Sequence, residues 1–449
     1  MSLDTGFPGP VEILQELIRR DTTNPPGREF ECVEYVESLL ERVGVESERL
    51  ASDPRRPNLW ARLPGTGEAP PLMLYGHCDV VPADGERWTH PPFDAVRSDG
   101  MIWGRGALDM KGGLAMMIAA FLRAACDARP AGDLILLVLA DEEASSELGA
   151  RYVVEEHPSR FEDVQYAIGE LGGFPLHVGD SRYYTVQVTE KRLCWLEATV
   201  TGAAGGHGAL PGDGTAVGRL GEVLSTVARG RLPVRITGPV RRMIRAMIRG
   251  ADDRAARSLG ELLDPSTAAR GLEELSELSE HRSLFEALLR DTVNPTVVRA
   301  GKSINVVPDR GVVRMDGRLL PGGEADRLTR SLDEMLPPNV REGVRYRVLR
   351  NPSGQGEPDL GLFPLLRDLL LDADPGGTPI PFVLPAVTDA HYFASLGIQT
   401  YGFLPLDLPR GFDLLDRIHA PDERVPVRSI RFGTRILRRL LRRYGRGDA

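Results

Sequence analysis

Three apolar runs, each followed at once by residues that can bind a cation, constrain this chain most. Residues 72–76 lead into His77-Cys78-Asp79, residues 134–140 lead into Asp141-Glu142-Glu143, and a shorter run ends at Glu170. Continuous apolar runs of this length are typical of strands that are buried in a sheet. Because open α/β sheets place their sites at the carboxyl ends of the strands, we expect these polar residues to lie at that edge.

Length and composition set the class of protein. The 449 residues are enough for two or three domains, each with its own core. A hydrophobic content of 42% and a charged content of 27% are ordinary for a globular protein. The net charge of -9 argues against nucleic acid or an anionic membrane as a partner.

The cysteines and the first residues bear on the compartment. Cys32, Cys78, Cys126 and Cys194 are widely spaced and form no CxxC pair, which predicts reduced, buried thiols rather than a disulfide framework. The first ten residues show no basic-then-apolar signal pattern, and no apolar run reaches the length of a membrane span. We therefore expect a cytoplasmic protein.

The periodicity of the chain predicts an α/β domain that is interrupted by a second domain. The first ~190 residues alternate helix-like and strand-like patterns, which indicates a mostly parallel sheet. Near Lys191 the pattern changes, and residues 231–289 look like an inserted helical segment. We expect domain boundaries at 190 and 350, with residues 351–449 returning to the first domain. Predicted helices lie at 10–20, 29–43, 114–126, 219–229, 364–373, 389–396 and 429–444.

His77 and Asp79 form the first candidate pair. Residues i and i+2 of a strand face the same side, so these two side chains point together and Cys78 points away. A metal-bound histidine usually gives its second ring N–H to a carboxylate, so Asp79 could orient His77. The alternative is a polar pair at a strand end that bonds only the backbone.

Asp109 lies in the glycine-rich segment 104–113. Glycines let the backbone bend tightly and approach an ion, and a carboxylate there can bridge two cations. The competing interpretation is a helix N-cap, because a helix beginning near Gly113 favours an acid just before it, and both roles can hold at once. A nucleotide loop is disfavoured, since neither GxGxxG nor GxxxxGK[ST] occurs.

Glu142 and Glu143 emerge at the end of a strand and project in different directions. One can bind a metal while the other acts as a general base toward a bound water. The alternative is an exposed acidic turn. Glu170 and His419, each taken alone, are more often structural residues than ligands.

The candidate residues balance the charge of two divalent cations. Asp109, Glu143 and Glu170 supply three negative charges, a bridging hydroxide supplies the fourth, and His77 and His419 complete the set as neutral ligands. Imidazole mixed with carboxylate favours Zn²⁺ over Mg²⁺ or Ca²⁺, with Co²⁺ or Mn²⁺ also suited.

The motifs resemble, in order, those of the M20 family of metallopeptidases and deacylases. They are GHCDVVP, GRGALDMKGG, DEE, GE, GGHGALP, INVVP, TDA and IHAPDERV, and the resemblance runs nearly end to end. It implies a zinc-exopeptidase-like catalytic domain with an inserted α+β lid or dimerisation domain. The helical segment makes this lid larger than in compact members, as in the long carboxypeptidase-like branch.

The resemblance also implies roles for individual residues. His77, Asp109, Glu143, Glu170 and His419 would be the ligands of two zinc ions, and Asp109 would bridge them. Glu142 would be the general base and Asp79 would support His77. Leu171 follows Glu170 at a position where the family more often has glycine.

Further candidates lie in the expected lid and near the C-terminus. His207, flanked by glycines, could stabilise a tetrahedral oxyanion, in its own chain or in a partner chain. Asn305 and Arg318 could bind a substrate carboxylate, for which the arginine fork is suited, although Arg318 could equally be a surface strand residue. Thr388 would line the site near His419.

We expect a two-zinc hydrolase that cleaves an amide bond of a small peptide or N-acyl amino acid. A metal-bridging hydroxide would attack the carbonyl, and Glu142 would carry the proton to the leaving amine. The alternative from another class is a metal-binding small-molecule binder on the same fold, without hydrolytic activity. A serine hydrolase is disfavoured because no GxSxG string occurs. The lid could also pair two chains into a homodimer.

Overall fold

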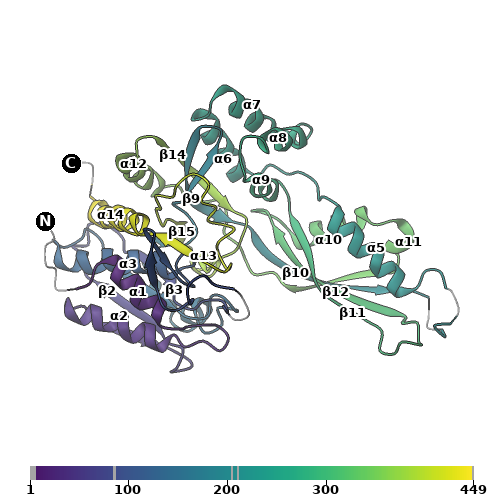
Figure 1. The fold of residues 1–449 in the computed structure, drawn as a ribbon, viewed down its shortest axis with the longest axis horizontal. Coiled ribbons are helices and arrows are strands. Elements are labelled where there is room, and N and C mark those ends of the chain that lie inside the picture. The colour runs from purple at the N-terminus through teal and green to yellow at the C-terminus, as the bar shows by residue number, and fades with distance from the viewer. Residues whose placement is uncertain (1–6, 84–86, 204–205, 210–211, 447–449) are drawn as a thin grey trace. The chain divides into compact units, whose positions relative to one another are not determined.

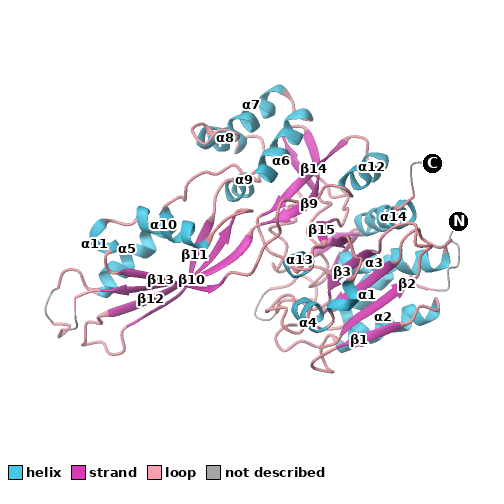
Figure 2. Cartoon of the chain, turned by 180° about the vertical axis from the view of Figure 1, so that it is seen from behind, coloured by secondary structure: helices cyan, strands magenta, loops and turns pink. Residues whose placement is uncertain are grey.

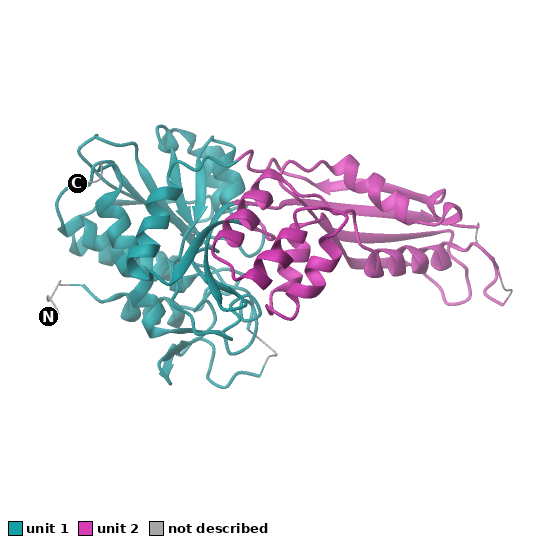
Figure 3. Cartoon of the chain, turned by 90° about the horizontal axis from the view of Figure 1, so that it is seen from above, with its two compact units in different colours: residues 1–188, 358–382, 388–449 teal, residues 189–357, 383–387 magenta. Residues whose placement is uncertain are grey.

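The computed structural model describes residues 7–83, 87–203, 206–209 and 212–446. Its helices and strands are shown in Figures 1 and 2, and its two compact units in Figure 3. Unit 1 comprises Met1–Val188, Pro358–Phe382 and Thr388–Ala449, and unit 2 comprises Thr189–Glu357 and Val383–Val387. The sequence-based boundaries were set at 190 and 350, and the function of each domain stays a prediction.

Unit 1 is built on a mixed sheet whose four central strands are parallel. They run in the spatial order β6 (Leu134–Leu139), β3 (Leu72–His77), β7 (Tyr166–Gly169) and β15 (Gln399–Gly402). All residues of β3 and β6 are buried, as continuous apolar runs predict. The flanking strands are β1 (Ser47–Leu50), β2 (Asn58–Leu63), β8 (Pro175–Val178), β9 (Ser181–Glu190) and β14 (Gly377–Leu384). The predicted α/β class with a mostly parallel central sheet is confirmed.

Helices cover both faces of this sheet. On one face, α3 (Lys111–Cys126) contacts β3 and β6, and α1 (Pro10–Arg19) and α14 (Val427–Arg443) contact α3. On the other, a buried cluster that includes Trp60, Tyr75 and Phe393 joins the sheet to α4 (Ala150–Glu156) and α13 (Ala390–Ala394). The remaining elements are α2 (Phe30–Arg42), the 3₁₀ turn Pro158–Phe161, α12 (Phe363–Ala373) and the small sheet of β4 (Val96–Ser98), β5 (Met101–Trp103) and β16 (Arg424–Pro426).

Unit 2 contains a four-stranded antiparallel sheet with helices on one face (Figure 2). The strands lie in the order β11 (Thr292–Ala300), β12 (Arg310–Leu319), β10 (Arg192–Thr201) and β13 (Val344–Arg350). Alternate residues of β10 and β12 pack against α5 (Ala216–Arg229), α10 (Ala325–Met335) and α11 (Pro338–Arg341). Residues 231–289 hold α6 (Gly238–Arg249), α7 (Asp253–Glu261), α8 (Ala268–Leu275) and α9 (Arg282–Leu288).

The seven predicted helices overlap α1, α2, α3, α5, α12, α13 and α14, and α3, α5 and α14 begin two or three residues earlier than predicted. Helix α3 starts at Lys111 with Met110 as N-cap and without a side-chain cap, so the prediction of Asp109 as its N-cap is wrong. Gly112 lies inside the helix, and a Cβ there would meet the Ala107 carbonyl oxygen at 2.2 Å, so the position requires glycine. This glycine permits close packing and does not end the helix.

The cysteine prediction is wrong for one residue. Cys126 is exposed at the end of α3, whereas Cys32, Cys78 and Cys194 are buried and all four are free. Cys126 is the last residue of the helix, where the packed face gives way to solvent. Across the described ranges, no helix is both long and apolar enough to cross a membrane.

Candidate metal centre

Three predicted ligands follow neighbouring parallel strands. His77 is the last residue of β3, Glu143 follows β6, and Glu170 comes directly after β7. Strand β3 lies between β6 and β7, and the register pairs His77 with Leu139 near the end of β6. Parallel pairing therefore gathers these side chains at one edge of the sheet.

The first cluster is fully buried and joins three of the predicted ligands. His77 Nε2 lies 3.2 Å from Asp109 Oδ1 and 3.5 Å from Glu170 Oε2. One ligand atom from each of these residues lies within 4.8 Å of the others. An imidazole and two carboxylates at this separation form a donor set that suits zinc-class ions.

The second cluster shares Asp109 with the first. His419 Nε2 lies 3.2 Å from Asp109 Oδ2 and 3.1 Å from Glu143 Oε2. The two oxygens of Asp109 therefore face different histidines, Oδ1 toward His77 and Oδ2 toward His419. This is the arrangement by which one carboxylate serves two cations.

Asp79 supports His77 and also ties two strand ends together. His77 Nδ1 lies 3.0 Å from the Asp79 carbonyl oxygen and 3.4 Å from Asp79 Oδ1, which leaves Nε2 for a cation when Nδ1 carries the proton. The Asp79 carboxylate accepts hydrogen bonds from the backbone N–H groups of Glu142 (3.2 Å) and Glu143 (3.1 Å). β3 ends at His77, so the contact between the two side chains arises beyond the strand.

Asn24 is a buried residue of the centre that sequence reasoning missed. Its Nδ2 donates to Asp79 Oδ2 at 2.8 Å and to Asp141 Oδ1 at 3.0 Å, and Arg56 forms an ion pair with Asp141 at 3.2 Å. The only sequence signal was a polar loop before two prolines, which does not specify these partners.

Glu142 lies beside the first cluster without belonging to either one. Its Oε2 is 4.0 Å from His77 Nε2, whereas the neighbouring Glu143 belongs to the second cluster. Burial, and next the charge of Glu170, raise the pKa of Glu142 well above its usual value. The adjacent glutamates thus occupy different chemical environments.

The electrostatics of the centre favour a bound cation. Within the described ranges, the ion-pair partners of Asp109, Glu143 and Glu170 are only His77 and His419. Burial and the nearby charge of Asp109 raise the pKa of Glu143 to about 7, and burial also raises that of Glu170.

The pKa values of the two histidines are raised by the neighbouring carboxylates. Hydrogen bonds to Asp109 and Glu143 raise the pKa of His419 to about 10. Burial alone would lower the pKa of His77, but Asp109, Asp79 and Glu170 raise it well above its ordinary value. Buried carboxylates without lysine or arginine partners need another source of positive charge, and divalent cations fit this donor set.

Thr388 and Asp389 are buried in unit 1. Thr388 Oγ1 accepts a hydrogen bond from Ala390 N at 3.1 Å, which places the hydroxyl at the start of α13. Burial raises the pKa of Asp389 to about 7, an effect that Ser146 opposes and the charge of Glu170 increases. The TDA motif thus contributes a further acid near the centre.

The other predicted residues belong to unit 2. Exposed His207 pairs with Val306 in an isolated bridge, and Gly208 N donates to the Asn305 carbonyl oxygen at 2.9 Å, so His207 and Asn305 are neighbours. Arg318, on β12, donates to both carboxylate oxygens of Asp316 at 2.8 and 3.0 Å. Of the GGHGALP motif, Gly205, Leu210 and Pro211 lie outside the described residues.

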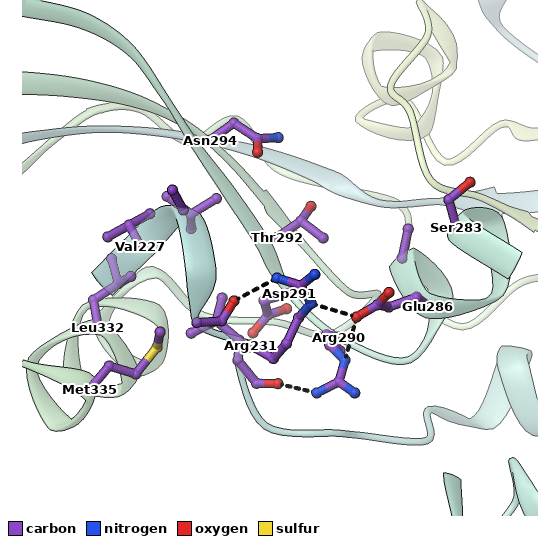
Figure 4. A pocket seen from close by; sticks show the side chains of 15 residues that line it. Val227, Arg231, Ser283, Glu286, Arg290, Asp291, Thr292, Asn294, Leu332 and Met335 are labelled. Carbon is purple, nitrogen blue, oxygen red and sulfur yellow. Dashed lines mark hydrogen bonds and ion pairs between the residues drawn. The ribbon is translucent and has the colours of Figure 1, made fainter. Parts of the chain in front are cut away.

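Unit 2 also has a cavity of about 350 Å³ between α5, α9, α10 and the start of β11 (Figure 4). Arg231 Nε lies 2.7 Å from Glu286 Oε1, and Arg290 Nη1 donates to the Leu232 carbonyl oxygen at 2.8 Å. Its charged side chains are therefore paired within the unit, and none of the predicted site residues lines it.

A central parallel sheet with histidines and carboxylates at its carboxyl edge, plus an inserted unit, is the architecture of a metal-dependent hydrolase. Residues 73–443 match peptidase family M20/M25/M40, and the chain belongs to this family. It is a metal-dependent amidohydrolase, as the resemblance of its motifs implied.

Relatives agree with this assignment. The N-fatty-acyl-amino acid synthase/hydrolase PM20D1 of Xenopus tropicalis is 28% identical over 372 residues, which are 80% of this chain and 70% of that protein. The structure of the M20 family metallo-carboxypeptidase Sso-CP2 of Sulfolobus solfataricus matches with a TM-score of 0.69 at 19% identity. The match covers 98% of this chain and 100% of the Sso-CP2 chain. The YXEP protein of Bacillus subtilis, a dinuclear metal binding peptidase from the M20 family, has a TM-score of 0.60 at 14% identity and covers 96% of each chain. These two structures share the fold.

Proposed function

We propose that this chain hydrolyses an amide bond of a small peptide or N-acyl amino acid with the aid of two divalent cations. The observation that carries the proposal is the position of Asp109, whose oxygens lie 3.2 Å from His77 and 3.2 Å from His419. The hydrolase PM20D1 and the dinuclear YXEP protein support the substrate class and the number of metals.

The two clusters would hold one cation each. His77, Asp109 and Glu170 would bind the first, and Asp109, Glu143 and His419 the second. This mixture of ligands favours Zn²⁺, with Co²⁺ or Mn²⁺ also suited. When bound, the cations would polarise the scissile carbonyl and lower the pKa of the attacking water.

Glu142 would move the proton. It lies next to the first cluster and outside both ligand sets, so its carboxylate is free to accept a proton from water and deliver it to the leaving amine. Burial and the nearby charge of Glu170 raise the pKa of Glu142, so its carboxyl group holds a proton more readily, which suits delivery of that proton to the amine. Asp79 would hold His77 in the tautomer that leaves Nε2 free.

Unit 2 would complete the site as a lid. His207 would donate a hydrogen bond to the developing oxyanion, and its neighbour Asn305 and Arg318 would bind the substrate carboxylate. Turnover would then require closure of the lid, in one chain or across a homodimer.

A hydrolysis screen tests the function. The protein would be freed of metal with a chelator, reloaded with Zn²⁺, and incubated with dipeptides, N-acyl amino acids and the methyl esters of the latter. We expect release of the free amine only in the reloaded protein, and weaker activity on the esters because they lack the carboxylate. Metal-dependent binding of a substrate without release of any amine would instead support a binder on this fold.

A further inference from the structure

We propose that the buried Arg105–Glu423 pair positions both Asp109 and His419, and so sets the geometry of the second cation site. Glu423 bonds the backbone of Asp109 and Arg105 bonds the backbone of His419, so the pair would act through the backbone of these ligands. This inference rests on the proposed two-metal function.

Glu423 holds the loop that carries Asp109. Its side chain is fully buried, and its carboxylate accepts hydrogen bonds from the backbone N–H groups of Gly106 (3.1 Å), Leu108 (2.7 Å) and Asp109 (3.1 Å). Successive backbone N–H groups that converge in this way form an anion-binding nest, which the carboxylate fills. The amide of the shared ligand is one of the three donors.

Arg105 connects the same carboxylate to the segment of His419. Its Nη1 donates to Glu423 Oε2 at 2.9 Å and to the Ala420 carbonyl oxygen at 3.1 Å, and Nη2 donates to the His419 carbonyl oxygen at 3.2 Å. The guanidinium lies over the Trp88 ring, 5.1 Å from its centroid. A planar fork with several fixed donors can hold these acceptors together, whereas an ammonium could not.

The neighbouring strands explain why the two residues meet. Glu423 directly precedes β16, which pairs with β5, and Arg105 follows β5 by two residues. The Gly104 N–H also donates to the Glu423 carbonyl oxygen at 2.9 Å. Two chain segments far apart in the sequence are thus locked where the loop to Asp109 begins.

The contacts of the Arg105–Glu423 pair reach the backbones of two ligands whose side chains contact each other. One member of the pair bonds the backbone of Asp109 and the other bonds the backbone of His419, and the side chains of these two ligands meet at 3.2 Å. A shift of either segment would change that separation. The first cluster shares only Asp109 with this arrangement, so its cation would be less affected.

Glu423→Gln is the informative variant. It keeps the shape but places an amide NH₂ against N–H donors, where the carboxylate had accepted from each of them. Loss of a group that orients metal ligands typically weakens metal affinity by about 10–100-fold. We expect this loss of affinity for the cation of the second cluster, and a smaller loss for the cation of the first cluster.

The experiment loads the holoprotein with Co²⁺ and removes it stepwise with a chelator, while cobalt content and the visible absorption of cobalt are recorded. Asp374→Asn is the matched control, because Asp374 also accepts from an arginine (Arg182), a hydroxyl (Tyr184, 2.8 Å) and a backbone N–H (Gly376, 3.2 Å) in unit 1 without touching a candidate ligand. The melting temperature of each metal-free protein is measured in parallel. Arg105→Lys, which keeps the charge but not the fork, is tested alongside in case Glu423→Gln does not fold.

The expected result is earlier loss of one cobalt ion and an altered spectrum in Glu423→Gln or Arg105→Lys, with wild-type cobalt release in Asp374→Asn. A lower melting temperature with unchanged cobalt release and spectrum would overturn the inference, because the pair would then serve stability only. Wild-type protein that binds a single ion would contradict the two-metal function, and loss of that ion in the variants would still decide the role of the pair.

Discussion

The two units of this molecule bury charge in different ways. In unit 1, Asp109, Glu143 and Glu170 crowd together, and among the described residues their ion-pair partners are the two histidines His77 and His419. In unit 2, the fully buried Lys191 donates to the Ala287 and Arg290 carbonyl oxygens and to Thr292 Oγ1, at 2.9–3.0 Å. The chain itself satisfies the charge of Lys191 in unit 2, whereas it leaves these three carboxylates of unit 1 for a cation.

Charge is also paired within the chain in the four-stranded sheet of unit 2. Glu197 accepts from Arg314 at 3.0 Å and from Arg347 at 2.8 Å, so one carboxylate is shared by two arginines from the adjacent strands. Buried charge that is paired within the chain indicates structure, and buried charge without such pairing marks a candidate for function. By this comparison the chemistry belongs to unit 1, and unit 2 would act on it through single residues.

The largest expected effect tests Glu142, an acid that lies beside the first cluster and belongs to neither ligand set. Glu142→Gln should keep its metal and its fold but lower kcat by about 10²–10⁴-fold, because an amide cannot accept the proton. Steady-state kinetics with elemental analysis of the same sample would measure both. Near-normal kcat in metal-replete Glu142→Gln would remove Glu142 from the reaction.

The next effect asks whether unit 2 contributes to the chemistry. His207→Ala should lower kcat by roughly 10²–10³-fold with metal content unchanged, the size of a lost oxyanion donor. Mixing it with Glu142→Gln would restore partial activity if His207 serves a partner chain, and none if each chain is complete. An unchanged kcat in His207→Ala would leave unit 2 without a catalytic group.

A smaller effect concerns Asn24, which holds Asp79 beside the metal centre of unit 1. Asn24→Ala removes the donor shared by Asp79 and Asp141, and leaving buried acceptors unsatisfied costs about 1–3 kcal/mol. We expect metal affinity to fall by about 10-fold, because Asp79 would no longer hold His77 as firmly. Chelator competition measures this loss. Wild-type affinity in a destabilised variant would limit Asn24 to a structural role.

A further prediction concerns stability rather than activity or metal binding, at Lys191 in unit 2. Burial lowers the pKa of Lys191 to about 7, from an ordinary value of 10.5. As the pH falls from 10.5 to 7, the unfolded chain binds a proton that the folded chain does not, so this residue destabilises the fold increasingly, and fully below pH 7. The free energy of unfolding of the wild type relative to Lys191→Met should therefore rise between pH 7 and 10 in denaturant titrations. A difference that does not change with pH would contradict the assignment.

The candidate ligands that follow strands could be predicted from the sequence, but the residues that hold these ligands in place could not. Parallel pairing brings residues at successive strand ends together, so the apolar runs pointed to His77, the Glu142–Glu143 pair and Glu170, and the glycine-rich loop pointed to Asp109. The family motifs then implied the role of each of these residues and of His419. The partners Asn24, Arg105 and Glu423 could not be assigned, because their contacts join segments that only the tertiary structure brings together. The N-cap prediction for Asp109 was wrong because α3 begins at Lys111, earlier than the expected start near Gly113, so that Met110 takes the N-cap position.

The proposed two-metal site depends most directly on Asp109, which would be shared by the two cations. Elemental analysis of the purified protein should find about two zinc-class ions per chain, as a two-metal site requires. Asp109→Ala should lose most of both, while the exposed Asp94→Ala should keep them. Full metal occupancy in Asp109→Ala, or an unoccupied wild-type protein after loading with Zn²⁺, would contradict the account.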